Sequence, residues 1–478
     1  MAAKRPSLAT GARIVTGVVV AAVAVVAAGA ALALPLPSVT AQPTSFTVDP
    51  APAEEVRACS GPLVRLSDDS GQDATAISGV GSAKVVAASG DAAVPLEQSA
   101  LASPDDRTST GSNAPQRVAL TPDASGADTL FAAAQSQTAS SGDLVGLAAA
   151  SCGEASADSW LVAGSTTVGR TSFVTLANPA DVAAVVDLSL YGDQGPIVSP
   201  GAKNLDVPAR STRIVSLAGL APDQADPVVH VVASVGSVTA SVQQSVVRGL
   251  EPGGVDVVGV TAPPSTSQTV AGLQISGTSA IAEKLADANY SDLTSVLRLL
   301  VPGDQPASVS IRIAEQKDGG AQTEYQVGLT PGVVTEFPLQ DVPDGTYTVT
   351  ADSDQPIVMS ARTSTLANGV TDFAWYQAVQ PLATTFFVAV ADGPNPQLTV
   401  VNAGDAPIDL TWTALDGGVG TASIPVGARS VPLQAGMSYT VAASAPVSAA
   451  MTYSGDGLLA SFGIEAPSPA AAPIVVYP

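Results

Sequence analysis

The sequence predicts an all-β protein in which an N-terminal transmembrane helix precedes three tandem β-sandwich repeats of immunoglobulin-like size. Three observations support this prediction: an uncharged N-terminal stretch, the composition, and a hairpin pattern that occurs three times. The 478 residues include 43 Gly and 37 Pro among abundant Ala and Val. Small and β-branched residues interrupted so often by turn formers indicate many short strands, and the length suits several domains.

The N-terminal stretch is long enough to span a membrane. Residues 14–34, IVTGVVVAAVAVVAAGAALAL, carry no charge, and as a helix they would extend about 30 Å, the thickness of a bilayer core. Residues 1–34 are therefore predicted to form a cytoplasmic tip and signal-anchor, with the cytoplasmic membrane as partner and the bulk of the chain extracytoplasmic. A cleaved signal peptide, ending at VTA before Gln42, is the alternative and would give a secreted protein. Basic residues precede the stretch and orient its N-terminus toward the cytoplasm: Lys4, Arg5 and Arg13.

The next part of the chain is predicted to be a spacer followed by a disulfide-closed region. Residues 35–58 are rich in Pro, Ser, Thr and Ala and cannot bury a core. Neither Cys59 nor Cys152 has a second Cys or a His at metal-ligand spacing, so outside the cytoplasm we expect the two to form a disulfide. Residues 59–152 are mostly loop-like and are predicted to be an N-terminal subdomain or insertion, and 469–478 a C-terminal tail.

The hairpin pattern is centred on three turns, NPAD, VPGD and NAGD, whose aspartates are predicted to bond nearby backbone amides: Asp181, Asp304 and Asp405. Apolar residues lie at the same odd offsets on both sides of each aspartate. A slip by one residue would exchange the buried and exposed faces of a strand. Because the apolar residues keep the same odd offsets from the aspartate in all three places, we predict that the three segments form the same kind of hairpin. Spans of about 80–110 residues suit sandwiches. The predicted repeats are 153–264, 265–382 and 383–468.

Several of these segments resemble a known family. The stretches CSGPL, SCGEASADSWLVAGSTT and FVTLANPADVAAVVDLSLYG are similar to a group of actinobacterial membrane-anchored proteins classified only as a domain of unknown function, DUF5719. The resemblance implies an envelope location and paired cysteines. It supplies no activity and no catalytic residues.

The sequence contains few residues that point to a catalytic, cofactor-binding or metal-binding site. His230 is the only histidine, and the repeat comparison places it in the strand position that Tyr347 and Tyr439 occupy in the other copies, which favours a packing role. A glycosidase-like carboxylate pair remains open, because acidic residues are plentiful. The net charge of −23 disfavours nucleic-acid binding, because an acidic surface repels the phosphate backbone. We therefore single out no catalytic, cofactor-binding or metal-binding residue and expect no cofactor.

These features predict a non-enzymatic, membrane-anchored extracytoplasmic protein that acts as a structural or binding scaffold in the cell envelope. Its further partner would be an envelope protein or glycan. The alternative is a cell-envelope glycan-processing enzyme that uses dispersed carboxylates.

Overall fold

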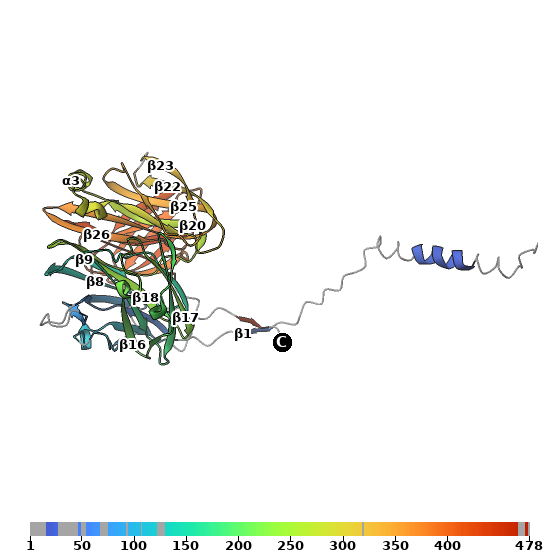
Figure 1. Ribbon diagram of the computed structural model, residues 1–478, viewed down its shortest axis with the longest axis horizontal. Helices are drawn as coiled ribbons and strands as arrows, with labels where there is room; N and C mark the ends of the chain where they lie inside the picture. Colours follow the sequence, from blue (N-terminus) through green and yellow to red (C-terminus); the bar gives the residue numbers. More distant parts are fainter. Residues whose placement is uncertain are drawn as a thin grey trace, which may run out of the picture. The chain divides into compact units, whose positions relative to one another are not determined.

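The computed structural model describes residues 16–26, 46–48, 54–66, 75–91, 94–106, 108–121, 130–317, 320–466 and 474–476. The chain divides into two units, one made of residues 1–51 and 471–478 and the other of residues 52–470 (Figure 1). In the first unit, residues 16–26 form a helix, and β1 (Phe46–Val48) pairs antiparallel with β35 (Ile474–Val476). No helix within the described residues is both long and apolar enough to cross a membrane. The rest of the predicted span 14–34 lies outside them.

The second unit is built mainly of strands, which confirms the all-β class. Its first stretch forms the sheets β11-β17-β13-β14, with β15 also paired to β13, and β16-β12-β18-β19. These strands are β11 (Asp158–Leu161), β12 (Arg170–Asn178), β13 (Ala184–Gly192), β14 (Gly195–Ile197), β15 (Leu205–Val207), β16 (Ser211–Ser216), β17 (Val228–Val235), β18 (Thr239–Arg248) and β19 (Glu251–Val258).

The next two stretches have the same strand order. In the second stretch, one long strand, β25, pairs first with β20 and β22 and then with β21 and β26, so it takes the places of both β17 and β18. The third stretch forms β27-β32-β29-β30 and β31-β28-β33-β34. The bounds are β20 (Ser265–Ile275), β21 (Val296–Leu300), β22 (Ala307–Glu315), β23 (Gln322–Leu329), β24 (Thr335–Pro338), β25 (Gly345–Ala367), β26 (Val370–Gln377), β27 (Thr385–Ala389), β28 (Gln397–Asn402), β29 (Ile408–Ala414), β30 (Val419–Ile424), β31 (Gly427–Pro432), β32 (Ser438–Ala443), β33 (Ser448–Gly455) and β34 (Leu458–Gly463).

Each stretch encloses its own apolar core. The alternating positions before and after the predicted turns face these cores, as the parity predicts: Val174, Leu176, Val186 and Leu188; Leu297, Leu299, Val309 and Ile311; and Leu398, Val400 and Leu410 are all buried. Short helices connect some of the strands: η1 (Gly111–Asn113), η2 (Pro200–Ala202), α2 (Leu217–Leu220), α3 (Thr278–Lys284) and η3 (Ala288–Leu293).

The N-terminal part of the unit, predicted to be mostly loop-like, is also made of strands, so that prediction is wrong. Its sheets are β10-β2-β7-β6 and β5-β8-β9, with a separate hairpin β3-β4. The order β2-β7-β6 matches β11-β17-β13, and β5-β8-β9 matches β12-β18-β19. Short, small-residue strands conceal the pattern: β2 (Glu55–Cys59), β3 (Leu63–Leu66), β4 (Ile77–Val80), β5 (Lys84–Ser89), β6 (Leu96–Ala100), β7 (Gln116–Leu120), β8 (Phe131–Ser141), β9 (Leu144–Ser151) and β10 (Gly153–Glu154).

The last long strands of these four parts contact one another in a ring. Strand β9 contacts β19, β19 contacts β26, β26 contacts β34, and β34 contacts β9. We call this set the four-strand junction. Strands β9 and β26 are labelled next to each other in Figure 1. The junction joins the four parts into one compact unit.

Candidate functional site

A buried carboxylate lies at the centre of the four-strand junction. Asp372, on β26, has no exposed surface and accepts backbone N–H groups from the other three strands. Its partners are Leu147 at 2.9 Å, Val255 at 3.3 Å and Leu459 at 3.1 Å. Burial raises the pKa of Asp372 to about 8. The backbone N–H donors lower this pKa, but burial has the larger effect.

Two glycines allow the strands to approach this carboxylate. Gly146 on β9 and Gly254 on β19 both have positive φ, at 142° and 117°. A Cβ at Gly254 would lie 2.8 Å from Asp372 Oδ1, and one at Gly146 would lie 2.9 Å from the backbone nitrogen of Val255 and closer still to Asp372. Only glycine permits this close approach with this backbone conformation.

The C-terminal ends of the junction strands border a cavity of about 320 Å³, which we call the strand-end pocket. Ser151 of β9, Gly259 after β19, Gln377 of β26 and Gly463 of β34 all line it. Its polar and aromatic lining also includes Glu154, Asp158, Ser159, Trp160 and Glu465. The pocket therefore combines residues from all four parts of the unit.

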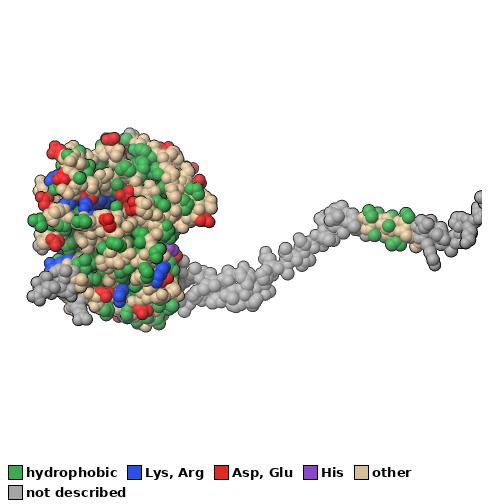
Figure 2. All heavy atoms as spheres, in the orientation of Figure 1, with side chains coloured by type: hydrophobic (Ala, Val, Ile, Leu, Met, Phe, Trp, Pro, Cys, Tyr) green, Lys and Arg blue, Asp and Glu red, His purple; other side chains and the backbone are tan. Residues whose placement is uncertain are grey.

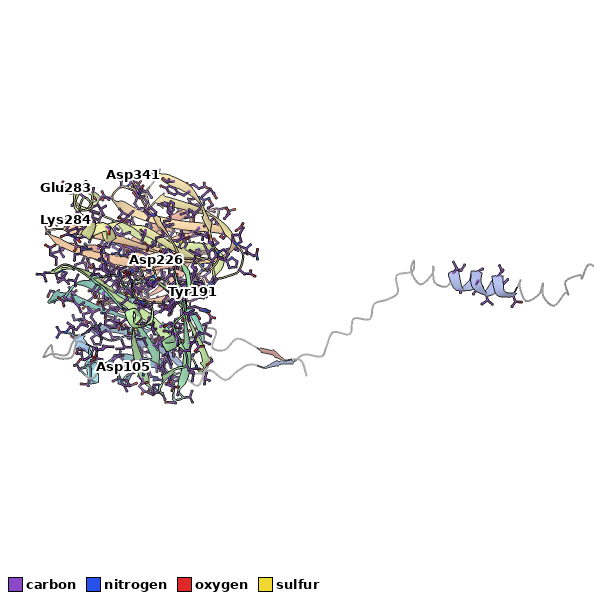
Figure 3. All side chains as sticks on the ribbon, viewed as in Figure 1. Asp105, Tyr191, Asp226, Glu283, Lys284 and Asp341 are labelled. Carbon is purple, nitrogen blue, oxygen red and sulfur yellow. A yellow bond between two sulfur atoms is a disulfide. The ribbon has the colours of Figure 1, made fainter. Side chains whose placement is uncertain are left out.

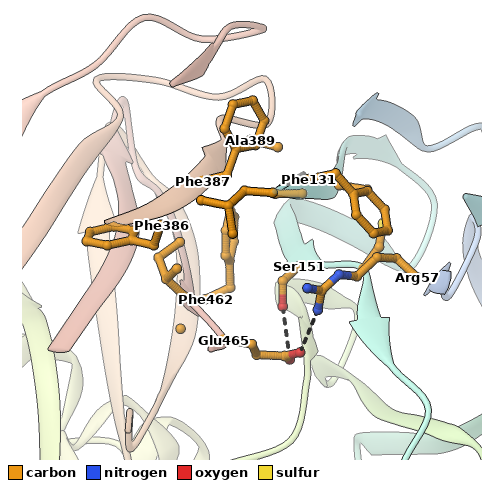
Figure 4. A pocket seen from close by; sticks show the side chains of 14 residues that line it. Arg57, Phe131, Ser151, Phe386, Phe387, Ala389, Phe462 and Glu465 are labelled. Carbon is orange, nitrogen blue, oxygen red and sulfur yellow. Dashed lines mark hydrogen bonds and ion pairs between the residues drawn. The ribbon is translucent and has the colours of Figure 1, made fainter. Parts of the chain in front are cut away.

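Arg57 binds two of the carboxylates of this pocket. Its buried guanidinium lies 2.8 Å from Glu154 and 3.7 Å from Glu465. Ser151 Oγ donates to Glu465 Oε1 at 3.5 Å, and Figure 4 shows Arg57 and Ser151 converging on Glu465. Burial and the nearby Glu154 raise the pKa of Glu465, whereas Arg57 opposes the rise. The adjoining phenylalanine-lined cavity in Figure 4 has a volume of only about 40 Å³.

A cluster of three aromatic side chains lies beside the pocket. The ring of His230 stacks on Trp160 with the centroids 3.9 Å apart. Its Nε2 lies 3.1 Å from both carboxylate oxygens of Asp158. Tyr191, labelled in Figure 3, lies next to the same indole at 6.0 Å. His230 is thus a packing residue that also positions a pocket carboxylate.

The predicted equivalence of His230 with Tyr347 and Tyr439 is wrong. His230 pairs with Ser189, eight residues after Asp181, and the residues that pair at the same offset in the other stretches are Thr350 and Thr440. The two tyrosines belong to the apolar cores, whereas the neighbours of His230 face the core and His230 faces outward. Alternation along a strand explains this difference, since a slip by an odd number of residues changes the face.

The predicted disulfide is confirmed. Cys59 and Cys152 are bonded, with both side chains buried. The turn aspartates Asp181, Asp304 and Asp405 each lie in the bend between the second and third strands of their stretch. Asp181 binds Arg210 at 2.7 Å, and this interaction lowers its pKa.

Two asparagines that were not among the predicted turn residues close two of these turns. Asn178 accepts the N–H of Ala180 and donates to the carbonyls of Val182 and Val207. In the third stretch, Asn402 makes the matching bonds with Gly404, Ala406 and Ile424. The asparagine that begins NPAD and NAGD could have predicted these hydrogen bonds from the sequence. In VPGD, Val301 stands in its place.

A second buried ionic cluster joins segments that are distant in sequence. Asp292 binds Arg170 at 2.8 Å, Arg248 at 2.6 Å and Arg362 at 3.3 Å, and these arginines lower its pKa to about 2 despite burial. Elsewhere, acidic side chains are scattered over the visible face in Figure 2. In the described ranges no group of three or more His, Cys, Asp or Glu side chains could hold a metal ion.

Comparison with known proteins places the chain in a family. No curated protein and no solved structure gives a significant match. A family model, described as a family of unknown function, matches residues 106–444. The matched region runs from the N-terminal part through all but the end of the third stretch. The chain belongs to the family of unknown function DUF5719.

Proposed function

We propose that this protein is a non-enzymatic, membrane-anchored extracytoplasmic protein that acts as a structural or binding scaffold in the cell envelope. In this proposal the stretches 153–264, 265–382 and 383–468 are three copies of one sandwich unit. Their common strand order and the matching bonds of Asn178 and Asn402 support the assignment.

The four-strand junction is the observation that carries the proposal. Asp372 hydrogen-bonds to three other strands and so fixes four parts of the chain in one unit. A rigid unit of this kind would hold its outer surfaces at constant separations, which suits a scaffold. The strand-end pocket gives the same unit a place to bind a small group.

The proposed location rests on the uncharged stretch 14–34 and on the disulfide. Disulfides persist mainly in oxidising compartments outside the cytoplasm. Protease added to intact, wall-stripped cells should digest the part of the chain after residue 35. Complete protection of that part would contradict the extracytoplasmic location.

The enzymatic alternative has one observation in its favour. The pKa of Glu465 is raised by burial and by the nearby Glu154. Glycosidases use a carboxyl group with a raised pKa close to a second carboxylate. Both groups, however, contact the same arginine, Arg57. That arrangement suits anchoring of a ligand better than proton transfer.

One experiment separates the two functions. Full-length protein in detergent micelles is incubated with envelope material from a strain lacking the gene, and both co-sedimentation and release of soluble sugars are measured. The scaffold proposal expects co-sedimentation with no release, from the wild type and from Glu465→Gln alike. Sugar release that Glu465→Gln abolishes would establish the enzyme, and absence of co-sedimentation would also overturn the scaffold.

A further inference from the structure

Strand β23 has an open edge. It is the end strand of its sheet and, among the described strands, pairs only with β22. The N–H of Glu315 donates at 3.0 Å to the carbonyl of Ala321, which lies directly opposite in the register of the two strands. Because hydrogen-bonded and non-hydrogen-bonded pairs alternate along an antiparallel ladder, every second residue of β23 directs its N–H and C=O away from β22. These outward-directed residues are Gln322, Glu324, Gln326 and Gly328.

This edge lacks the protection that is usual for edge strands. Proteins protect such strands by making them short or by placing proline, lysine or a bulge in them. The end strand at the same position in the first stretch, β14, has three residues and contains Pro196. Strand β23 has eight residues in unbroken register with β22, and Glu324 is its one charged residue. It lies at the upper margin of the unit in Figure 1, where the edge is available to another strand.

Half-buried apolar side chains border the same edge. Tyr325 of β23 contacts Phe337 of β24, with the ring centroids 5.0 Å apart. Both residues and Val327 pack against the core of the second stretch but are only partly buried. Side chains on an added strand would contact those of β23 and cover them further, and the burial of apolar surface is favourable.

A second copy of β23 is complementary to this edge. A two-fold axis relates identical neighbouring strands when they run antiparallel. If the two Tyr325 residues lie opposite each other, Glu324 lies opposite Gln326 of the second copy, and Gln322 lies opposite Gly328. This register engages all four outward-directed residues of both copies. It also separates the two Glu324 carboxylates and places each one opposite an amide that donates hydrogen bonds.

We propose that two copies of this protein associate through antiparallel pairing of their β23 strands, centred on Tyr325. The paired strands join the two sheets into one continuous sheet across the interface. This inference goes beyond the scaffold role proposed above and does not depend on it.

Cysteine cross-linking of the full-length protein in detergent micelles tests the register. The chain has two cysteines, and they are bonded to each other, so one introduced thiol reports on the new contact alone. Tyr325→Cys would create a non-hydrogen-bonded pair with Cα atoms about 4.5 Å apart, close enough for a disulfide. Thr323→Cys is the matched control on the same face of β23, because its two copies would lie about 14 Å apart. Under mild oxidation we expect Tyr325→Cys to form a linked dimer and Thr323→Cys to form at least about tenfold less, since such a gap cannot be bridged.

A proline substitution tests the backbone ladder. Gln326→Pro removes one outward N–H, and an open edge tolerates proline at such a position. Gln326→Ala removes the same side chain but keeps the N–H. In sedimentation equilibrium we expect the wild type to self-associate and the Pro variant to associate at least about tenfold more weakly than the Ala variant, a factor that corresponds to about 1.4 kcal/mol. Melting curves confirm that each variant is folded.

Four results would overturn the inference. Equal cross-linking of the two cysteine variants would show random collision, and no cross-linking of either would show that the strands do not meet. Equal association of the Pro and Ala variants would place the contact elsewhere. A monomeric wild type would leave the edge of β23 to a strand of a different protein.

Discussion

Buried acidic and basic residues give this protein its specific contacts at the scale of the single residue. Asp372 accepts N–H groups from three other strands, and Arg57 contacts two carboxylates of the strand-end pocket. Asp256, also fully buried, accepts the N–H of Trp375 across the junction at 2.8 Å. In an otherwise apolar interior, these bonds fix which strand ends lie next to each other.

Replacing Asp372 by Asn should lower the free energy of unfolding by about 1–3 kcal/mol, because an amide group would face backbone donors that now have an acceptor. The substitution should also change the pH dependence of stability. The folded pKa of Asp372, about 8, exceeds the ordinary value of 3.8, so the folded state binds more protons between these values. Its contribution is complete below the lower value and is lost as pH rises through about 8.

Urea unfolding of the wild type and of Asp372→Asn across this pH range measures both effects. The difference between the two proteins isolates Asp372 from Asp256, whose pKa is raised as well. A difference that does not change with pH would contradict the assignment.

His230 should contribute through its ring. His230→Phe retains the stacking on Trp160 and loses only the contact with Asp158, so we expect stability to fall by less than about 1 kcal/mol. His230→Thr, which introduces the residue of the equivalent strand positions, removes the stacking and should cost about 0.5–1.5 kcal/mol more than the Phe variant. Thermal melting ranks the three proteins. A Phe variant less stable than the Thr variant would refute the packing role.

At the scale of the element, the last strand of each part differs from the others in what it contacts. Most strands have one face on the core of their own stretch, and their alternation is readable in the sequence. Strands β9, β19, β26 and β34 also pack against one another. Glycines at two positions make that second contact possible.

Gly146→Ala should separate β9 from its neighbours. The added Cβ would meet Asp372 and the backbone nitrogen of Val255, and neither can move without breaking a hydrogen bond. Overpacking of this kind costs about 1–3 kcal/mol, to which the positive φ adds strain. Chemical denaturation measures the loss.

Gly328→Ala is the matched control, because the Cβ at this β23 position meets nothing within 4 Å. We expect it to be neutral or to stabilise by about 0.4–1 kcal/mol through the unfolded state. Equal losses in the two variants would show that the junction is not the cause.

At the scale of the whole molecule, residues 52–470 form one compact unit rather than a chain of independent modules. Arg298 of the second stretch, for example, donates to the carbonyls of Gly164 and Pro227 in the first, at 2.8 and 2.9 Å. The ionic cluster around Asp292 likewise joins the first and second stretches. Contacts of this kind couple the stability of one part to the next.

Unfolding of this unit should therefore be cooperative. Calorimetry of the full-length protein should give one main transition for residues 52–470, because loss of any one part exposes the junction. Hydrogen exchange should give similar protection to β9, β19, β26 and β34. Well-separated transitions, one for each stretch, would contradict this expectation and would show that the stretches unfold as independent modules.

The sequence by itself determined the all-β class, the buried parity of three hairpins and the cysteine pair. Each of these depends on local order: alternation with period two, turn residues, and a single possible partner for each thiol. The sequence also determined that the protein carries a net negative charge. The error on His230 arose from the same alternation, because an alignment error of an odd number of residues reverses the face of a strand.

Only the tertiary structure decided the junction, the strand-end pocket and the strands of residues 54–154. Asp372 and its partners Leu147, Val255 and Leu459 are separated by between 87 and 225 residues, and no periodicity links them. The pocket residues come likewise from four parts of the chain. Such contacts arise because each junction strand buries its second face against strands from other parts of the folded chain. The local sequence pattern of a strand does not specify which distant strand will pack there.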